Sequence, residues 1–140
     1  PGAPTRPRRP GARPRSARGI RIKEMPHLQI ETTRRVAESI DLGDLLANLA
    51  QWFAAQESVE PKAVKAYARI HDHWAMGDPS RSDFLHLTVA ILSGRPLDLR
   101  QVWSRSFHLM LTEAISHSPL SDSTGITVEI REMDALTYCK

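Results

Sequence analysis

The stretch that decides the fold of this chain is PHLQIE, residues 26–31. Leu28 and Ile30 alternate with polar residues, so every second side chain is apolar. This period of two predicts a strand with one buried face. Pro26 can open such a strand, because a proline is tolerated at the first strand position.

The residues that follow predict a helix and a second strand. After a polar connector over residues 32–39, apolar residues recur at helical spacing, which predicts a helix that ends near Gln56. Pro61 bars further helix, and alternation over residues 64–71 predicts a second strand. The apolar positions of the helix are Leu42, Leu45, Leu46, Leu49 and Phe53.

The same plan then recurs. Residues 84–92 alternate as a third strand. A Gly94-Arg95-Pro96 turn then precedes a second helix, with the proline expected at the first helical position. Residues 126–131 alternate as a fourth strand. The buried stripe expected for this helix is Leu99, Val102, Trp103, Ser106 and Met110. We expect an α+β fold in which a repeated β-α-β unit forms a four-stranded sheet with both helices on one face. Because these strands are rich in apolar residues, we expect the other face to be buried in a homo-oligomer.

Residues 1–24 have a different composition from the rest. They hold eight Arg or Lys, one Glu and five Pro, which predicts a disordered segment next to a folded domain over residues 25–140. Three interpretations of this segment compete. It is a basic arm, a transit-like peptide, or upstream sequence translated from a start codon assigned too early. We favour the last, because five prolines oppose the amphipathic helix of a transit peptide.

Charge and composition narrow the functional classes. Residues 25–140 carry eleven basic and fifteen acidic side chains, so nucleic-acid binding by the domain is not expected. No apolar run approaches the ~20 residues of a membrane span. Cys139 is the single cysteine and cannot form an internal disulfide. We expect a cytoplasmic protein.

Pro26 is the candidate catalytic residue. If synthesis begins at Met25 and this methionine is removed, Pro26 carries a free secondary amine. An ordinary α-amino group titrates at about 7.7–8.0, close to the pH at which general bases work well. Burial and nearby cations would lower that pKa further. Pro1 lies in the flexible segment and receives no catalytic role.

Four features together carry a family resemblance: the Met-Pro-His opening at residues 25–27, Trp74–Asp78, Phe84–Thr88 and Gly94-Arg95. Over residues 25–132 the chain resembles the 5-carboxymethyl-2-hydroxymuconate isomerase family of the tautomerase superfamily. The resemblance implies a homotrimer whose N-terminal proline moves a proton between carbons of an unsaturated dicarboxylate, without metal or cofactor, in aromatic-acid breakdown.

The resemblance also implies two substrate-binding residues. Arg95 matches the family arginine that holds a substrate carboxylate, a task suited to a planar guanidinium. Lys65 stands where the family usually has a second arginine; it keeps the charge but loses the two-pronged geometry. Arg69 is an alternative whose spacing fits less well.

Other interpretations remain open. His71 and His73 lack a third ligand at suitable spacing, so no metal site is expected. In one alternative the chain is a catalytically silent trimeric scaffold whose basic tail binds acidic partners. In another it is a related tautomerase that acts on a different keto acid.

Overall fold

The computed structural model describes residues 2–3 and 26–140 of the chain. Its main elements are β1 (His27–Thr33), α2 (Arg34–Ser39), α3 (Leu42–Ala54), β2 (Lys65–His71), β3 (Asp83–Leu92), α4 (Leu97–Ile115) and β4 (Thr124–Met133), with 3-10 turns η1 (Pro61–Ala63) and η2 (Ser121–Ser123). The segment 1–24 that we expect to be disordered lies outside the described residues, apart from residues 2–3. The predicted strand-helix-strand repeat is confirmed.

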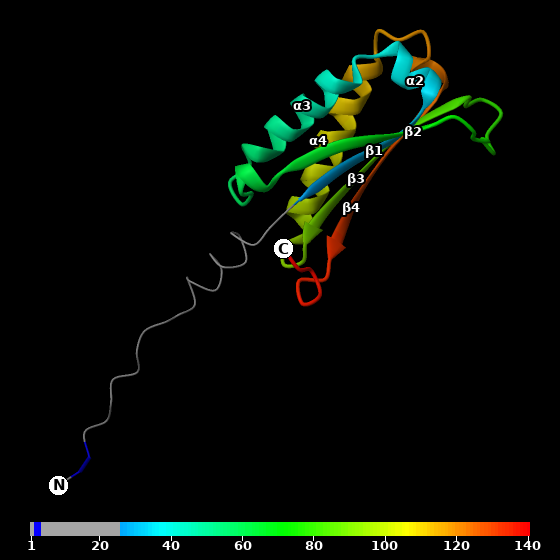
Figure 1. Cartoon of the computed structure of the whole chain (residues 1–140). Helices are drawn as coiled ribbons and strands as arrows, with labels where there is room; N and C mark the ends of the chain where they lie inside the picture. The colour runs from blue at the N-terminus through cyan, green and yellow to red at the C-terminus, as the bar shows by residue number, and fades with distance from the viewer. Residues whose placement is uncertain (1, 4–25) are drawn as a thin grey trace.

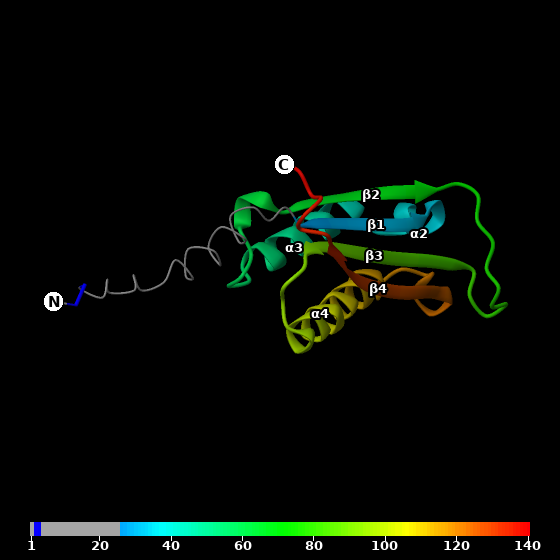
Figure 2. The ribbon, with the colours of Figure 1, turned by 90° about the horizontal axis from the view of Figure 1, so that it is seen from below.

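The four strands form one sheet in the order β2-β1-β3-β4. β1 runs parallel to β2 and β3 runs parallel to β4, while the two central strands, β1 and β3, are antiparallel. A helix joins the two strands of each parallel pair, because parallel neighbours need a long crossover. Both helices, α3 and α4, cover the same face of the sheet (Figure 1), and the strands lie side by side in one layer when seen from below (Figure 2). The predicted α+β class is confirmed.

The core lies between the sheet and the two long helices. Leu28 and Ile30 have fully buried side chains, as the period of two predicts. α3 begins where the side chain of Asp41 accepts a hydrogen bond from the Asp44 N–H at 2.9 Å, which satisfies a free donor of the first turn. The other core residues are Leu45, Leu49, Phe53, Val59, Leu85, Leu87, Val89, Ile91, Trp103, Phe107 and Leu111.

The face of the sheet that the helices leave open carries mainly polar side chains, and its burial in a homo-oligomer stays a prediction. Glu31 on β1 pairs with His71 on β2, with 3.1 Å between Oε1 and Nε2. On the other half, the ring of His86 lies between the hydroxyls of Thr127 and Thr88, at 2.7 and 3.0 Å. Alternation explains the result, because the fully buried residues of β1 and β3, such as Leu28, Ile30 and Leu87, point to the helix-covered face.

Two local expectations also differ from the structure. The connector expected over residues 32–39 completes β1 and then forms the short helix α2. In α4, Val102 is 48% exposed, while Phe107 is fully buried. The buried residues of α4 recur every four positions, at Trp103, Phe107, Leu111 and Ile115. Because a helix turns by about 100° per residue, the expected stripe lies to one side of this observed stripe after Trp103. Pro96 caps α4 and is not its first helical residue.

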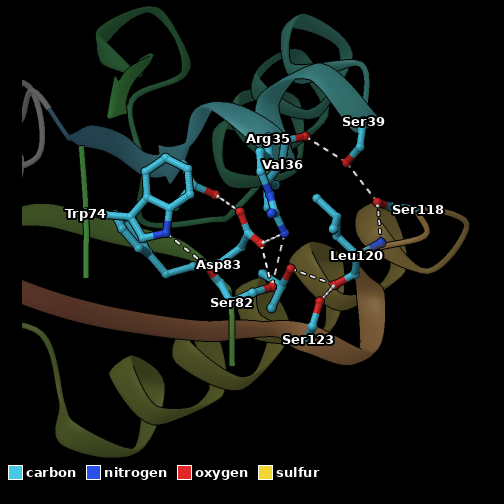
Figure 3. Close-up of polar contacts among 12 residues, drawn as sticks. Arg35, Val36, Ser39, Trp74, Ser82, Asp83, Ser118, Leu120 and Ser123 are labelled. Carbon is cyan, nitrogen blue, oxygen red and sulfur yellow. Dashed lines mark hydrogen bonds and ion pairs between the residues drawn. The ribbon is translucent and has the colours of Figure 1, made fainter. Parts of the chain in front are cut away.

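Asp83, the first residue of β3, is completely buried and joins several elements (Figure 3). Its carboxylate accepts hydrogen bonds from the hydroxyls of Thr33 and Ser82 and from the guanidinium of Arg35, each at 2.7 Å. Burial by itself raises the pKa of Asp83, but the hydrogen bonds from Ser82, Thr33 and Arg35 outweigh it and hold the pKa below its ordinary value. This network fixes the end of the sheet opposite to Pro26.

Candidate active site

Pro26 stands directly before β1 and is buried. Its carbonyl oxygen accepts a hydrogen bond from the Lys65 N–H, with 3.1 Å between nitrogen and oxygen. The next residue, His27, lies opposite Lys65 on one side and Ala90 on the other. Because side chains alternate, the ring of Pro26 belongs to the same helix-covered face as Leu28. Pro26 therefore lies at one end of the central strands, held in register by β2.

Lys65 is the first residue of β2, and the structure brings it next to Pro26 through the backbone. Its exposed side chain lies on the open face of the sheet, in the same row as His27. The pKa of His27 is lowered, first by burial and then by the positive charge of Lys65. Arg69 lies four residues further along β2, about 13 Å away at the usual rise of a strand. Lys65 is thus the nearer of the two cations considered.

Arg95 lies in the turn between β3 and α4. β3 is antiparallel to β1, so its last residues lie beside the start of β1 and Arg95 is at the same end of the sheet as Pro26. The guanidinium donates to the carbonyl of Ser58 at 2.7 Å and to the Ser58 hydroxyl at 3.3 Å. It also lies 5.3 Å from the ring centre of Trp103.

These contacts make Arg95 a partly buried cation. Burial lowers the pKa of Arg95, but a guanidinium stays protonated in proteins. In this arrangement Arg95 ties the segment after α3 to the start of α4. Ser58 and Trp103 are thus among the contacts that hold the guanidinium at this end of the sheet.

Tyr67 and Tyr138 are neighbours of the site that sequence reasoning missed. Their hydroxyls lie 3.3 Å from Nδ1 and 3.3 Å from Nε2 of His27, respectively. The register of β2 could have indicated Tyr67, because it lies two residues after Lys65 and therefore on the same face. Nothing in the sequence indicated Tyr138, which is 111 residues away from His27.

The cavities of the described part of the chain include one at each end of the sheet. One, of about 670 Å³, is lined by Leu92 and residues 135–140 and lies at the Pro26 end, because β3 ends there. The other, of about 350 Å³, lies between the start of α3 and the last turns of α4, at the opposite end, and is lined by Asp41, Asp44, Leu45, Asn48, Met110, Glu113 and Ala114. The lining of the first cavity includes Tyr138 but not Pro26, Lys65 or Arg95.

Within residues 26–140, no three His, Cys, Asp or Glu side chains are placed to hold a metal ion. His71 bonds instead to Glu31. None of the helices described is both long and apolar enough to cross a membrane.

Comparison with known proteins gives a family and a fold. A family model described as 5-carboxymethyl-2-hydroxymuconate isomerase matches residues 26–140. The chain is similar to the crystal structure of a 5-carboxymethyl-2-hydroxymuconate isomerase from Deinococcus radiodurans R1, with 23% identity and a TM-score of 0.73 over 84% of this chain and 89% of that one. A 5-carboxymethyl-2-hydroxymuconate delta-isomerase has 17% identity and a TM-score of 0.73, over 83% and 87%.

A more distant similarity is to a fused 4-OT protein described as a symmetric trimer, with 12% identity and a TM-score of 0.56 over 77% of this chain and 85% of that one. No curated protein sequence matches the chain. The solved structures show a shared tautomerase-like fold, and the family match spans every helix and strand, from β1 to β4. The chain therefore belongs to the 5-carboxymethyl-2-hydroxymuconate isomerase family and is an isomerase.

Proposed function

We propose that this isomerase moves a proton within 5-carboxymethyl-2-hydroxymuconate or a similar unsaturated 2-hydroxy or 2-keto diacid, with Pro26 as the general base. The observation that carries the proposal is that the family match begins at Pro26, the residue that the fold places, buried, at the end of the central strands. The amine takes a proton from one carbon and returns it to another. Substrate and product have the same formula, so the proton transfer needs no external oxidant or reductant.

The base requires a free amine at Pro26. We therefore propose that the working chain begins at Pro26, after removal of Met25, and that residues 1–24 are upstream sequence. A peptide nitrogen is not basic, whereas an α-amino group titrates near neutrality. Burial of Pro26 would lower the pKa of its amine and leave more of the neutral, basic form at pH 7.

The substrate's carboxylates need cations at the same end of the sheet. We assign Lys65 and Arg95 to this role. Lys65 is assigned because its backbone N–H bonds to the Pro26 carbonyl and its side chain is exposed. Arg95 is assigned because it lies in the turn after β3 and carries a partly buried charge. A carboxylate binds more strongly to a cation that is shielded from water.

The proposed enzyme is a cytoplasmic homotrimer of aromatic-acid breakdown. The polar open face of the sheet is the surface that we assign to subunit contacts, and the similarity to a fused 4-OT symmetric trimer supports this state. Paired groups such as Glu31 and His71 make the face compatible with an interface that is more polar than a core.

A chain that begins at Pro26 tests the proposal. It should isomerise 5-carboxymethyl-2-hydroxymuconate, followed by ultraviolet absorbance, and Pro26→Ala should lower kcat by roughly 100-fold with a much smaller change in KM. Pro119→Ala, at an exposed proline, is the matched control and should keep full activity. An unchanged kcat for Pro26→Ala removes the assigned base.

Intact mass of the protein made from its own gene tests the start site. A chain that begins at Pro26 agrees with the proposal. A chain that retains the basic segment and shows no isomerisation supports the scaffold alternative instead, and its contact with an acidic partner should weaken steeply with salt.

A further inference from the structure

The segment after β4 folds back to the start of β1. In both ribbon views the C-terminus lies beside the beginning of β1 (Figures 1 and 2). The N–H groups of Thr137 and Tyr138 donate to the carbonyl of Asp134 at 3.2 and 3.0 Å, which closes a turn. Within residues 134–140, Tyr138 is the residue that is not exposed. The turn thus delivers one anchored side chain.

That side chain completes a row of three rings on the open face. The ring of His27 lies between Tyr67 and Tyr138 and makes edge contacts with both, at centroid distances of 6.0 and 6.4 Å. Each ring nitrogen of His27 has a tyrosine hydroxyl at 3.3 Å. A neutral imidazole has one donor and one acceptor nitrogen, so one hydroxyl accepts a hydrogen bond and the other donates one. The row holds the imidazole from both sides.

The following charged and titratable groups of the same subunit face this imidazole within the described residues. Lys65 and Tyr67 face it from β2, and Tyr138 faces it from the C-terminal segment. On the other side, β3 presents Ala90, beyond which Arg131 of β4 lies in the same row. Burial, and after it the positive charge of Lys65, lower the pKa of His27, which favours the neutral imidazole.

We propose that Tyr138 is a positioning residue for the Pro26 base and acts through His27. The inference rests on the proposed function, because it concerns the same amine. In a chain that begins at Pro26, the first residue is joined to the protein by one peptide bond, and that bond leads to His27. A ring clamped by two hydroxyls limits the motion of His27 and therefore the direction in which the amine points.

Direction matters because proton transfer needs close alignment. A displacement of about 1 Å at a reacting group can cost up to about 100-fold in rate. The hydrogen bond from the Lys65 N–H holds the carbonyl oxygen of the peptide unit that joins Pro26 to His27. Loss of one of the two hydroxyl contacts should therefore loosen the amine partly, and lower kcat by roughly tenfold.

The test uses a chain that begins at Pro26 and the variant Tyr138→Phe, which keeps the ring and removes the hydroxyl. We expect kcat to fall about tenfold, with KM within about twofold of the parent value and an unchanged melting temperature. Thr127→Val is the matched control, because it removes the hydroxyl that contacts a different histidine of the same face, His86, and should leave kcat unchanged.

A double-mutant cycle separates action through His27 from direct action. If Tyr138 acts through His27, adding Tyr138→Phe to His27→Ala should not lower kcat further. The proposal is overturned if the double variant loses as much kcat as the two single variants together. An unchanged kcat in Tyr138→Phe also overturns it. So does a fall of the same size in Thr127→Val.

One further measurement keeps this inference separate from the proposed function. The titration of the Pro26 amine can be followed by nitrogen NMR without substrate. Loosening of the amine in Tyr138→Phe should raise its pKa by about half a unit, because the amine becomes more hydrated. If the parent is inactive but this shift is seen, the proposed function fails and the positioning role stands; an unmoved titration refutes the positioning role whatever the activity.

Discussion

Replacement of Asp83 by alanine should destabilise the domain, and the structure gives the size of the loss. The change leaves the buried hydroxyl of Thr33 without its acceptor, which costs about 1–3 kcal/mol. The bond to Arg35 adds little, roughly 0.5 kcal/mol, because the side chain of Arg35 is 54% exposed. With the bond from Ser82 also lost, we expect about 3 kcal/mol in the free energy of unfolding.

This loss should be visible in thermal denaturation followed by circular dichroism. For a domain of this size about 4 °C of melting temperature corresponds to 1 kcal/mol, so a decrease of roughly 10 °C is expected. Asp122→Ala, at an exposed aspartate of η2, is the control and should change the melting temperature by less than about 2 °C. A decrease below about 3 °C for Asp83→Ala would refute the network as a stabilising feature.

The same variant gives a pH signature. The folded-state pKa of Asp83 is lowered from its ordinary value, so folding favours the charged carboxylate. The stability that it contributes is complete above the unfolded-state pKa of about 3.9 and is lost as the pH falls through the lower folded-state value. The difference in stability between parent and Asp83→Ala should therefore be constant near neutral pH and become smaller below about pH 4. A difference that grows in acid contradicts this assignment.

Two other predictions concern the Pro26 end of the domain. Arg95→Lys keeps the charge but loses the planar guanidinium, so it should raise KM by roughly tenfold with little change in kcat; initial rates measure this, and an unchanged KM places the carboxylate elsewhere. The side chain of Trp103 is 1% exposed and packs against Phe53 at a ring-centroid distance of 4.9 Å. Trp103→Ala should therefore lower the free energy of unfolding by about 3–5 kcal/mol, measured by urea denaturation.

Much of the fold could be predicted because each periodic segment carries its own signal. Alternation in β1 and β3 and the helical spacing in α3 predict both the element and its buried face, and the structure confirms them. The stripe of α4 was the weak point, since Val102 and Trp103 are adjacent apolar residues and only packing against β4 and α3 selects Trp103 for the core.

The site was predictable only in part. Pro26 and Lys65 are close in the fold because two predicted strands pair in parallel, which brings the starts of the two strands together. Arg95 follows the end of β3 and is placed by the antiparallel pairing, but its hydrogen bonds to Ser58 depend on where the segment after α3 passes. No periodic pattern describes such a segment.

The sequence by itself determined the order of strands and helices, which face of each strand is apolar, and the chemical candidacy of Pro26, since these depend on the spacing of neighbouring residues. Only the tertiary structure decided that Glu31 and His71 pair across the open face, that Asp83 is a buried carboxylate, and that Tyr138 contacts His27. Those features join residues that are far apart in the chain, and their energies arise from burial and hydrogen bonding that exist only once the sheet has formed.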